Sequence, residues 1–227
     1  MKQNLFLILP LAIAPALFAA DSSPKEAVTT AAKKLEEVGN YTWKTTTVVP
    51  ETARFKPGPI DGKTEKDGFT YVTLSMGDTL SEIALKGEKS VVTNTEGDWL
   101  PASELENGEG RNRFIGRMAR NFKKPAGQAL DLLPAIKELL KNGDVYSGDL
   151  TEEGAKKQFR FGDPKNPTGS VKFWVKDGLL SKYEVKVEAK VEINGEEIDA
   201  SRTATTEIKD TGATKVNVPS EAKKKLS

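Results

Sequence analysis

The sequence contains neither cysteine nor histidine among its 227 residues. Without cysteine the chain forms no disulfide, offers no thiolate metal ligand and cannot carry a lipid on an N-terminal cysteine. Without histidine it lacks the commonest general base and the commonest side-chain ligand for metals. We therefore expect no metal site and no cofactor, and a fold that its hydrophobic core alone holds together.

The motifs of enzyme active sites are also missing. The sequence has no G-x-S-x-G nucleophile elbow, no phosphate-binding P-loop and no EF-hand spacing. A pair of carboxylates could still catalyse a reaction, but most acidic residues alternate with lysines on strand faces that water would cover. We predict no catalytic residues and no enzymatic activity.

Neither sign of charge is in large excess, with 34 Lys and Arg against 33 Asp and Glu. Removal of Lys2 with the signal peptide described next makes the two numbers equal. A neutral chain generates no broad field that would attract nucleic acid or an anionic membrane. We therefore expect no nucleic-acid partner.

Residues 1–20 have the pattern of a cleavable secretory signal peptide. A short basic start is followed by an apolar run from Leu5 to Phe18 and then by small residues. The run is too short for a comfortable membrane span, although an uncleaved anchor is the alternative. We predict export to the periplasm, no stable membrane span and a single domain over residues 21–227.

The most regular pattern is an unbroken alternation of apolar and charged residues from Lys182 to Ile193. Period two is typical of a strand with one buried face, and at about 3.4 Å per residue this strand is roughly 40 Å long. Asn194-Gly195 then favours a two-residue hairpin turn. The turn predicts these pairs: Ile193 with Glu196, Val191 with Ile198, Ala189 with Ala200, Val187 with Arg202, Val185 with Ala204, Lys190 with Asp199, and Lys182 with Glu207.

Residues 176–178 predict the turn that precedes the long strand. A two-residue loop would place Phe173 opposite Lys182 and mix apolar with charged faces. A three-residue loop with Gly178 in the left-handed conformation pairs Phe173 with Ser181 instead and keeps the faces consistent. We predict the three-residue loop with a bulge, and hence a three-stranded meander.

Periodicity and turn residues divide the remaining chain. Helices are predicted over residues 24–38, with a capping box from Ser23 to Glu26, over 111–122 and 127–140, and briefly from Ser220. The other predicted strands are 41–49, 69–76, 79–86, 89–95, 145–150, 157–161 and 216–219, and the predicted loops are 50–62, 100–110 and 162–169. This order indicates an α+β fold, in which helices close one strongly curved antiparallel sheet.

Several segments together carry a resemblance to a known family. They are the helix before Tyr41-Thr42-Trp43, Lys86-Gly87-Glu88-Lys89 with Gly97-Asp98-Trp99, the mid-chain helices, the stretch 173–179, and Ile208-Lys209-Asp210-Thr211-Gly212 with Val216-Asn217-Val218-Pro219. This layout resembles the LolA-like family of exported lipoprotein and lipid carriers, which includes LppX-like lipid-binding proteins. The resemblance implies an unclosed β-barrel whose open side is covered by helices, around an apolar cavity that holds acyl chains.

The lipoprotein carrier of that family also uses an arginine on an early strand. Arg54 lies in a comparable region of this sequence, but Pro57 and Pro59 disturb the alignment. The role of that arginine is therefore not transferred to Arg54.

The predicted cavity lies between the inner face of the sheet and the helices. Its candidate ligand-binding residues are Trp43, Val72, Leu74, Met76, Ile83, Leu85, Phe114, Met118, Leu133, Ile136, Phe173, Val175, Tyr183, Val185, Val187 and Arg202. Arg202 is the one charged residue in the apolar stripe of its strand. It either reaches water at a bulge or rim, or pairs with a ligand carboxylate or phosphate at the cavity mouth.

Residues 111–124 carry two stripes that each allow two interpretations. Arg113, Arg117, Arg120 and Lys124 form either a solvated helix face or a docking surface for an acidic partner or lipid head groups. The apolar stripe of Phe114, Met118 and Phe122 is either core or an adaptable cavity lid.

Two functions fit these features. One is an exported soluble carrier of a lipid or lipoprotein, with an envelope protein as its donor or acceptor. The other is a non-enzymatic envelope interaction or sensing module with a filled interior. The inner face carries three small residues, Ala189, Ala200 and Ala204. They favour open space beside the sheet, as a carrier needs, and the alternative is tight packing against a helix. We favour the carrier. Burying about 12 methylenes of an acyl chain in a groove yields roughly 10 kcal/mol before ordering costs, which is enough to hold a lipid out of water.

Overall fold

The computed structural model describes residues 22–227 except 54–55, 77–78, 160–161 and 194. The predicted signal peptide, Arg54 and Asn194 therefore lie outside the described residues. Within the described ranges, twelve antiparallel strands form one sheet that does not close into a barrel, and six α-helices accompany it. The α+β fold predicted from the order of elements is confirmed.

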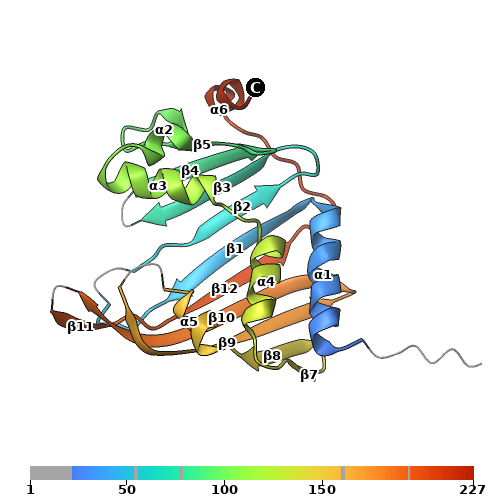
Figure 1. Cartoon of the computed structure of the whole chain (residues 1–227). Helices are drawn as coiled ribbons and strands as arrows, with labels where there is room; N and C mark the ends of the chain where they lie inside the picture. The colour runs from blue at the N-terminus through green and yellow to red at the C-terminus, as the bar shows by residue number, and fades with distance from the viewer. Residues whose placement is uncertain (1–21, 54–55, 77–78, 160–161, 194) are drawn as a thin grey trace, which may run out of the picture.

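The labels in Figure 1 show the order of the elements along the chain. The strands are β1 Tyr41–Val48, β2 Ile60–Thr64, β3 Thr70–Met76, β4 Thr79–Lys86, β5 Lys89–Thr93, β6 Trp99–Pro101, β7 Leu140–Asn142, β8 Val145–Asp149, β9 Pro164–Lys176, β10 Leu179–Ile193, β11 Glu196–Asp199 and β12 Arg202–Lys209. The helices are α1 Pro24–Val38, α2 Ala102–Glu106, α3 Gly110–Arg120, α4 Pro125–Leu132, α5 Glu152–Lys156 and α6 Ser220–Leu226, with a 3-10 turn η1 Leu133–Ala135.

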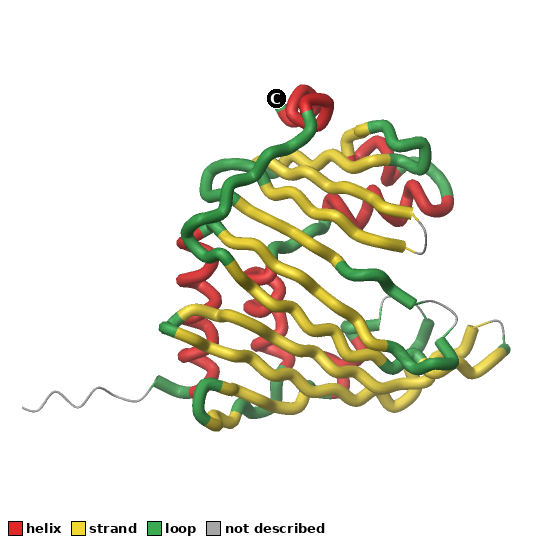
Figure 2. The backbone as a smooth tube through the Cα atoms, turned by 180° about the vertical axis from the view of Figure 1, so that it is seen from behind, coloured by secondary structure: helices red, strands yellow, loops and turns green. Residues whose placement is uncertain are grey.

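The strand order across the sheet is β6-β5-β4-β3-β2-β1-β12-β10-β9-β8-β7, and β11 pairs with β10 beside this path. Helices α1 to α5 lie over one face, which we call the inner face (Figure 1). The C-terminal segment crosses the opposite, outer face and ends in α6, which packs on β4, β5 and β6 (Figure 2). In the described chain, no helix is both long and apolar enough to cross a membrane.

Each face has its own hydrophobic core. The larger one joins the inner face to the helices and includes Leu35 of α1, Ile115 of α3 and Phe173 of β9. The smaller one lies on the outer face under the C-terminal segment and contains Trp99, Val216, Val218, Ala222 and Leu226. Strands β4 and β5 are consequently buried on both sides.

Local signals fixed the first helix. The Ser23 side chain accepts a hydrogen bond from the Glu26 N–H, and the Glu26 carboxylate accepts one from the Ser23 N–H, as the predicted capping box requires. Gly39 ends the helix at φ +69° with its N–H bonded to the Leu35 carbonyl oxygen. The prediction of a helix over residues 24–38 is confirmed.

The long hairpin also has the predicted register. Ile193 pairs with Glu196, Val191 with Ile198 and Lys190 with Asp199. Beyond the hairpin, Val187 lies opposite Arg202, Val185 opposite Ala204 and Lys182 opposite Glu207, and the Ala200 N–H bonds to the Ala189 carbonyl oxygen. Alternation and turn chemistry together were therefore sufficient to set this register.

The three-residue loop predicted before β10 is wrong. Asp177 and Gly178 form a two-residue turn, both at positive φ, so that Lys176 pairs with Leu179. A bulge at Ser181 then shifts the register, and Tyr183 faces Phe173. The Ser181 hydroxyl donates to the Trp174 carbonyl oxygen at 3.1 Å. The extra residue keeps apolar side chains together, as the prediction required, but it lies in the strand rather than in the loop.

Two predictions, one of a loop and one of a strand, are wrong in segments that contain proline. Residues 162–169 were predicted as a loop, yet β9 begins at Pro164, because β8 pairs only with Ser170–Trp174 and leaves the earlier part of β9 at an edge. Residues 216–219 are not a strand: Val216 and Val218 are buried on the outer face without ladder pairing. Period two there reflects an extended segment lying on the sheet.

Four other segments differ from expectation. Strand β2 begins at Ile60 inside the predicted loop 50–62, and α2 lies in the predicted loop 100–110, where Ala102 and Leu105 are buried. Helix α4 ends at Leu132 because Pro134 opens a 3-10 turn, so the residues to 140 are not α-helical. The strand predicted over residues 157–161 does not form in its described part: residues 157–159 make a turn after α5, which ends at Lys156. Residues 160–161 lie outside the described chain.

Candidate functional site

The inner face is fully covered along the row through Trp43. Strand register places Ile83, Val72, Gly62, Trp43 and Ile208 side by side, and all five are buried. A Cβ on Gly62 would lie 2.0 Å from Trp43 Cζ2, so the indole crosses β2 where the side chain is missing. A glycine inside a strand often marks such a close approach, and this signal went unused in the sequence.

Coverage decreases along β1 and β12 away from that row, and on β10 Val185 is half-buried between the buried Tyr183 and Val187. We use the name inner strip for the half-buried inner-face residues Thr45, Thr47, Ile60, Val185, Arg202 and Ala204. Pairing makes the strip continuous, since Thr45 faces Ile60, Thr47 faces Ala204, and Ala204 faces Val185. No helix ribbon lies over β1 and β2 between α3 and α5 (Figure 1). The inner strip is therefore the candidate binding surface.

Aromatic side chains border the strip on its covered side. Phe122, just after α3, stacks on Trp43 with ring centroids 6.2 Å apart, and Trp43 lies 5.8 Å from Tyr41. Phe114, Met118 and Phe122 are half-buried and pack against the inner core, whereas Ile115 and Ala119 are the buried residues of α3. The predicted apolar stripe thus borders the core instead of filling it.

A polar chain runs beneath α4. The Tyr183 hydroxyl donates to Gln128 Oε1 at 2.7 Å, and the hydroxyls of Thr45 and Thr206 lie 2.8 Å apart. Burial raises the pKa of Tyr183 well above its usual range, which keeps this donor protonated. Nothing in the sequence marked Gln128 as a partner of Tyr183, because the two residues are 55 positions apart.

Arg202 is half-buried on the inner strip and has protein partners. Its guanidinium donates a hydrogen bond to the carbonyl oxygen of Gln158 and lies 5.0 Å from the ring centroid of Phe159. Both partners follow α5, so Arg202 connects β12 to the segment that leads into β9. A guanidinium is also a group that can bind a carboxylate or phosphate through two parallel hydrogen bonds.

The other predicted cavity residues fall into two groups. Those buried in the inner core are Trp43, Val72, Leu74, Ile83, Leu133, Ile136, Phe173, Tyr183 and Val187. Those partly buried against it are Leu85, Phe114, Met118, Val175 and Val185. Met76 belongs to β3, but its side chain is outside the described part. The structure brings the described members of the set to one face, and of these only Val185 and Arg202 lie in the inner strip.

The basic stripe of α3 is partly neutralised. Glu106 of α2 lies 2.6 Å from Arg120 and 4.0 Å from Arg117, and the Arg113 Nε donates to the Gly108 carbonyl oxygen. These arginines are exposed at the surface and hold α2 against α3. Among the described residues there is also no group of acidic side chains that could hold a metal ion.

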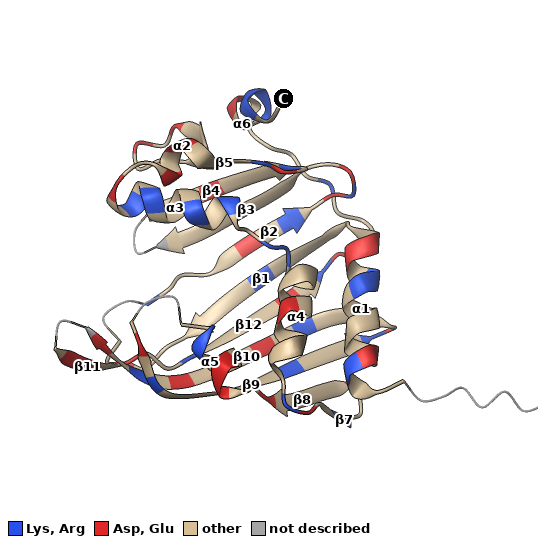
Figure 3. Ribbon diagram, in the orientation of Figure 1, with Lys and Arg blue, Asp and Glu red and all other residues tan. Residues whose placement is uncertain are grey.

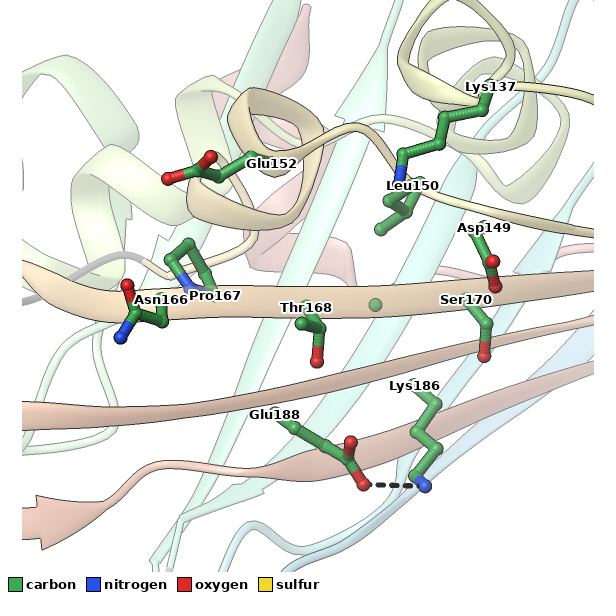
Figure 4. A pocket seen from close by; sticks show the side chains of 11 residues that line it. Lys137, Asp149, Leu150, Glu152, Asn166, Pro167, Thr168, Ser170, Lys186 and Glu188 are labelled. Carbon is green, nitrogen blue, oxygen red and sulfur yellow. Dashed lines mark ion pairs between the residues drawn. The ribbon is translucent and has the colours of Figure 1, made fainter.

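Two surface cavities in the described chain lie away from the strip. One, of about 460 Å³, has polar walls from β8, β9 and β10, with Lys186 and Glu188 paired at 2.6 Å (Figure 4). The other, of about 440 Å³, lies along β12, β1, β2 and β3 and is bordered by Lys44, Lys63 and Lys209. Most residues that line the two cavities are polar or charged, and neither cavity includes a residue of the inner strip.

An open antiparallel sheet with helices over its inner face is the LolA/LppX-like fold, and comparison with solved structures supports this assignment. Lipoprotein LppX of Mycobacterium tuberculosis matches with a TM-score of 0.50 and 12% identity over 88% of this chain and 100% of that chain. At this identity the likeness shows the fold alone. No family model matches the sequence, and no curated protein matches it significantly.

Two further solved structures are similar over most of their length. LprF from Mycobacterium bovis has a TM-score of 0.45 and 10% identity, covering 88% of this chain and 97% of that one. An outer membrane lipoprotein-sorting protein domain from Vibrio parahaemolyticus has a TM-score of 0.31 and 7% identity, covering 82% and 92%.

Proposed function

We propose that this protein is an exported carrier that holds acyl chains of a lipid or lipoprotein against the inner strip. The observation that carries the proposal is the half-buried strip on the inner face of a sheet with the fold of LppX. The proposal includes removal of residues 1–20 on export to the periplasm, a single domain over residues 21–227, no enzymatic activity, and an envelope protein as donor or acceptor.

The chemistry of the strip suits a hydrocarbon tail with a polar end. Val185, Ala204 and Ile60 offer apolar surface, and each methylene buried there contributes about 0.8 kcal/mol. Thr45 and Thr47 are small enough to let a chain approach the backbone. Arg202 at the far end of the strip would bind a carboxylate or phosphate at the head of the same molecule.

Much of the inner core is already filled by the protein. Leu35, Val72, Ile83 and Phe173 have no exposed surface. An acyl chain therefore lies along the strip, and covering it fully requires α3 and α4 to shift, with the half-buried Phe114, Met118 and Phe122 packing over it.

The filled part of the core favours one second candidate, a non-enzymatic envelope interaction or sensing module. Native mass spectrometry of protein purified from cells separates the two. The carrier predicts co-purifying lipid and uptake of a fluorescent fatty acid. A clean apo mass with no uptake would overturn the carrier and leave the module.

A matched pair of variants locates the binding surface. Ala204→Phe fills the strip with a ring, whereas Thr205→Phe places the same ring on the outer face of the same strand. We expect Ala204→Phe to reduce fatty-acid uptake at least tenfold and Thr205→Phe to leave it unchanged. Equal uptake by the two variants would rule out the inner strip as the site.

A further inference from the structure

Five lysines meet where the β4-β5 hairpin touches the C-terminal helix. We use the name lysine cluster for Lys86, Lys89, Lys223, Lys224 and Lys225. Lys86 and Lys89 pair at the end of the hairpin, and the last three belong to α6. Figure 3 shows the blue of these lysines on α6 at the C-terminal end of the chain.

Contacts between the hairpin and α6 hold the cluster together. The Nζ atoms of Lys86 and Lys223 lie 5.2 and 5.9 Å from the ring centroid of Phe69, so one ring gathers two cations. Lys89 Nζ donates a hydrogen bond to the backbone oxygen of Ser227. Ala222 and Leu226 anchor the helix in the outer core, which leaves its lysines at the surface.

The charge of the cluster is not compensated as it is elsewhere on the sheet. Lysines on the outer face of the long strands pair with carboxylates, such as Lys172 with Glu184 at 3.4 Å. In the described structure no Asp or Glu side chain forms an ion pair with any of the five cluster lysines, and Lys89 alone bonds to a main-chain oxygen, that of Ser227. Glu88 and Glu221 are the acidic residues within the hairpin turn and α6. The local excess is therefore positive although the whole chain is neutral.

We propose that the lysine cluster is a docking surface for an anionic phospholipid membrane. Its chemistry is that of clustered, flexible ammonium groups, which bind a diffuse layer of phosphate head groups without a defined pocket. The cluster lies at the end of the sheet covered by α6, away from α1 (Figure 1). This inference goes beyond the proposed function, because membrane docking requires no bound cargo.

Vesicle flotation of the full chain tests the inference. We expect binding to vesicles of equal phosphatidylglycerol and phosphatidylcholine, loss of binding at high salt, and no binding to phosphatidylcholine alone. Each lysine beside an anionic bilayer strengthens binding roughly fivefold. Neutralising Lys223, Lys224 and Lys225 to Gln should therefore weaken binding about a hundredfold.

Two more variants protect this test from unfolding and from general charge effects. K86Q/K89Q leaves α6 intact and should weaken binding about 25-fold. K25Q/K33Q/K34Q removes three exposed, unpaired lysines from α1 in the described chain and should leave binding within about threefold of the parent. Equal losses from α1 and α6, or no binding by the parent, would overturn the inference.

Fatty-acid uptake from solution separates this inference from the proposed function. The lysine-cluster variants should take up soluble fatty acid as the parent does, because the inner strip is unchanged. Failed uptake with intact vesicle binding counts against the carrier alone, and intact uptake with failed vesicle binding counts against the docking surface alone.

Discussion

The Tyr183 hydroxyl of β10 donates a 2.7 Å hydrogen bond to the Gln128 side-chain oxygen of α4. It joins the longest strand to the helix that lies over it, although 55 residues separate the two partners. Because the bond fixes α4 beside the inner strip, the same contact bears on stability and on access to the candidate site.

Replacing Tyr183 by Phe should lower the free energy of unfolding by about 1–2 kcal/mol, since it removes the bond and leaves the Gln128 oxygen without its donor. Tyr41→Phe is the control. The Tyr41 hydroxyl is buried on the same face and bonds to no other side chain among the described residues. Urea unfolding should show a change within about 0.5 kcal/mol for that variant. Equal losses would show that the Tyr183 bond does not stabilise the fold.

Stability should also fall at alkaline pH. Burial raises the pKa values of Tyr41, Tyr71 and Tyr183 above the ordinary value of 10.0. The unfolded chain then releases these protons first, so the free energy of unfolding decreases as pH rises beyond about 10. Denaturant titrations at neutral pH and at about pH 11 measure the decrease. In the variant with all three tyrosines changed to Phe, the decrease should shrink, and an unchanged slope would contradict the assignment.

Gly62→Ala should lower the free energy of unfolding by about 3 kcal/mol, because the new methyl group overlaps the Trp43 indole. Tryptophan fluorescence should shift as the ring leaves β2. Gly127→Ala in α4 is the matched control. A Cβ added at Gly127 would lie 3.9 Å from Lys123 Cβ, its nearest contact outside the helix backbone and the adjoining residues, so there is room for it. Ala is also the better helix former by up to about 1 kcal/mol. A destabilising Gly127→Ala together with a neutral Gly62→Ala would be inconsistent with this packing.

Arg202→Leu should leave the fold intact and weaken fatty-acid binding about tenfold, the effect of losing one charge-assisted hydrogen bond. Uptake of the corresponding fatty alcohol should not change, because the alcohol has no carboxylate. Arg113→Leu removes another arginine that donates to a carbonyl oxygen, outside the inner strip, and should affect neither ligand. If fatty acid and fatty alcohol respond alike to Arg202→Leu, the residue does not recognise the head group.

Some of the candidate site followed from the sequence. Alternation in β10 and the turn at residues 194–195 assigned Val185, Val187 and Arg202 to one face, and the pairing across β12 confirmed it. The sequence could not distinguish the buried Val187 from the half-buried Val185, because both have the same period and similar neighbours. Helices distant in sequence decide which of the two is covered.

Whole-chain charge was equally uninformative about the surface. Near neutrality argued against a broad attraction to anionic membranes, and the lysine cluster forms only because the hairpin and α6 meet across the ring of Phe69. Lys86 and Lys223 are far apart in sequence, so no local window shows them as one patch.

The sequence by itself determined the bounds of α1 and the register of β10 with β11 and β12, because caps, turns and period-two alternation act over a few residues. Tertiary structure alone decided that a bulge lies at Ser181 and that β9 begins at a proline, Pro164. It also decided that the C-terminal segment is buried without strand pairing. Each of these depends on a partner elsewhere in the chain. Burial and strand pairing are properties of such encounters, so they appear only when the whole sheet has formed.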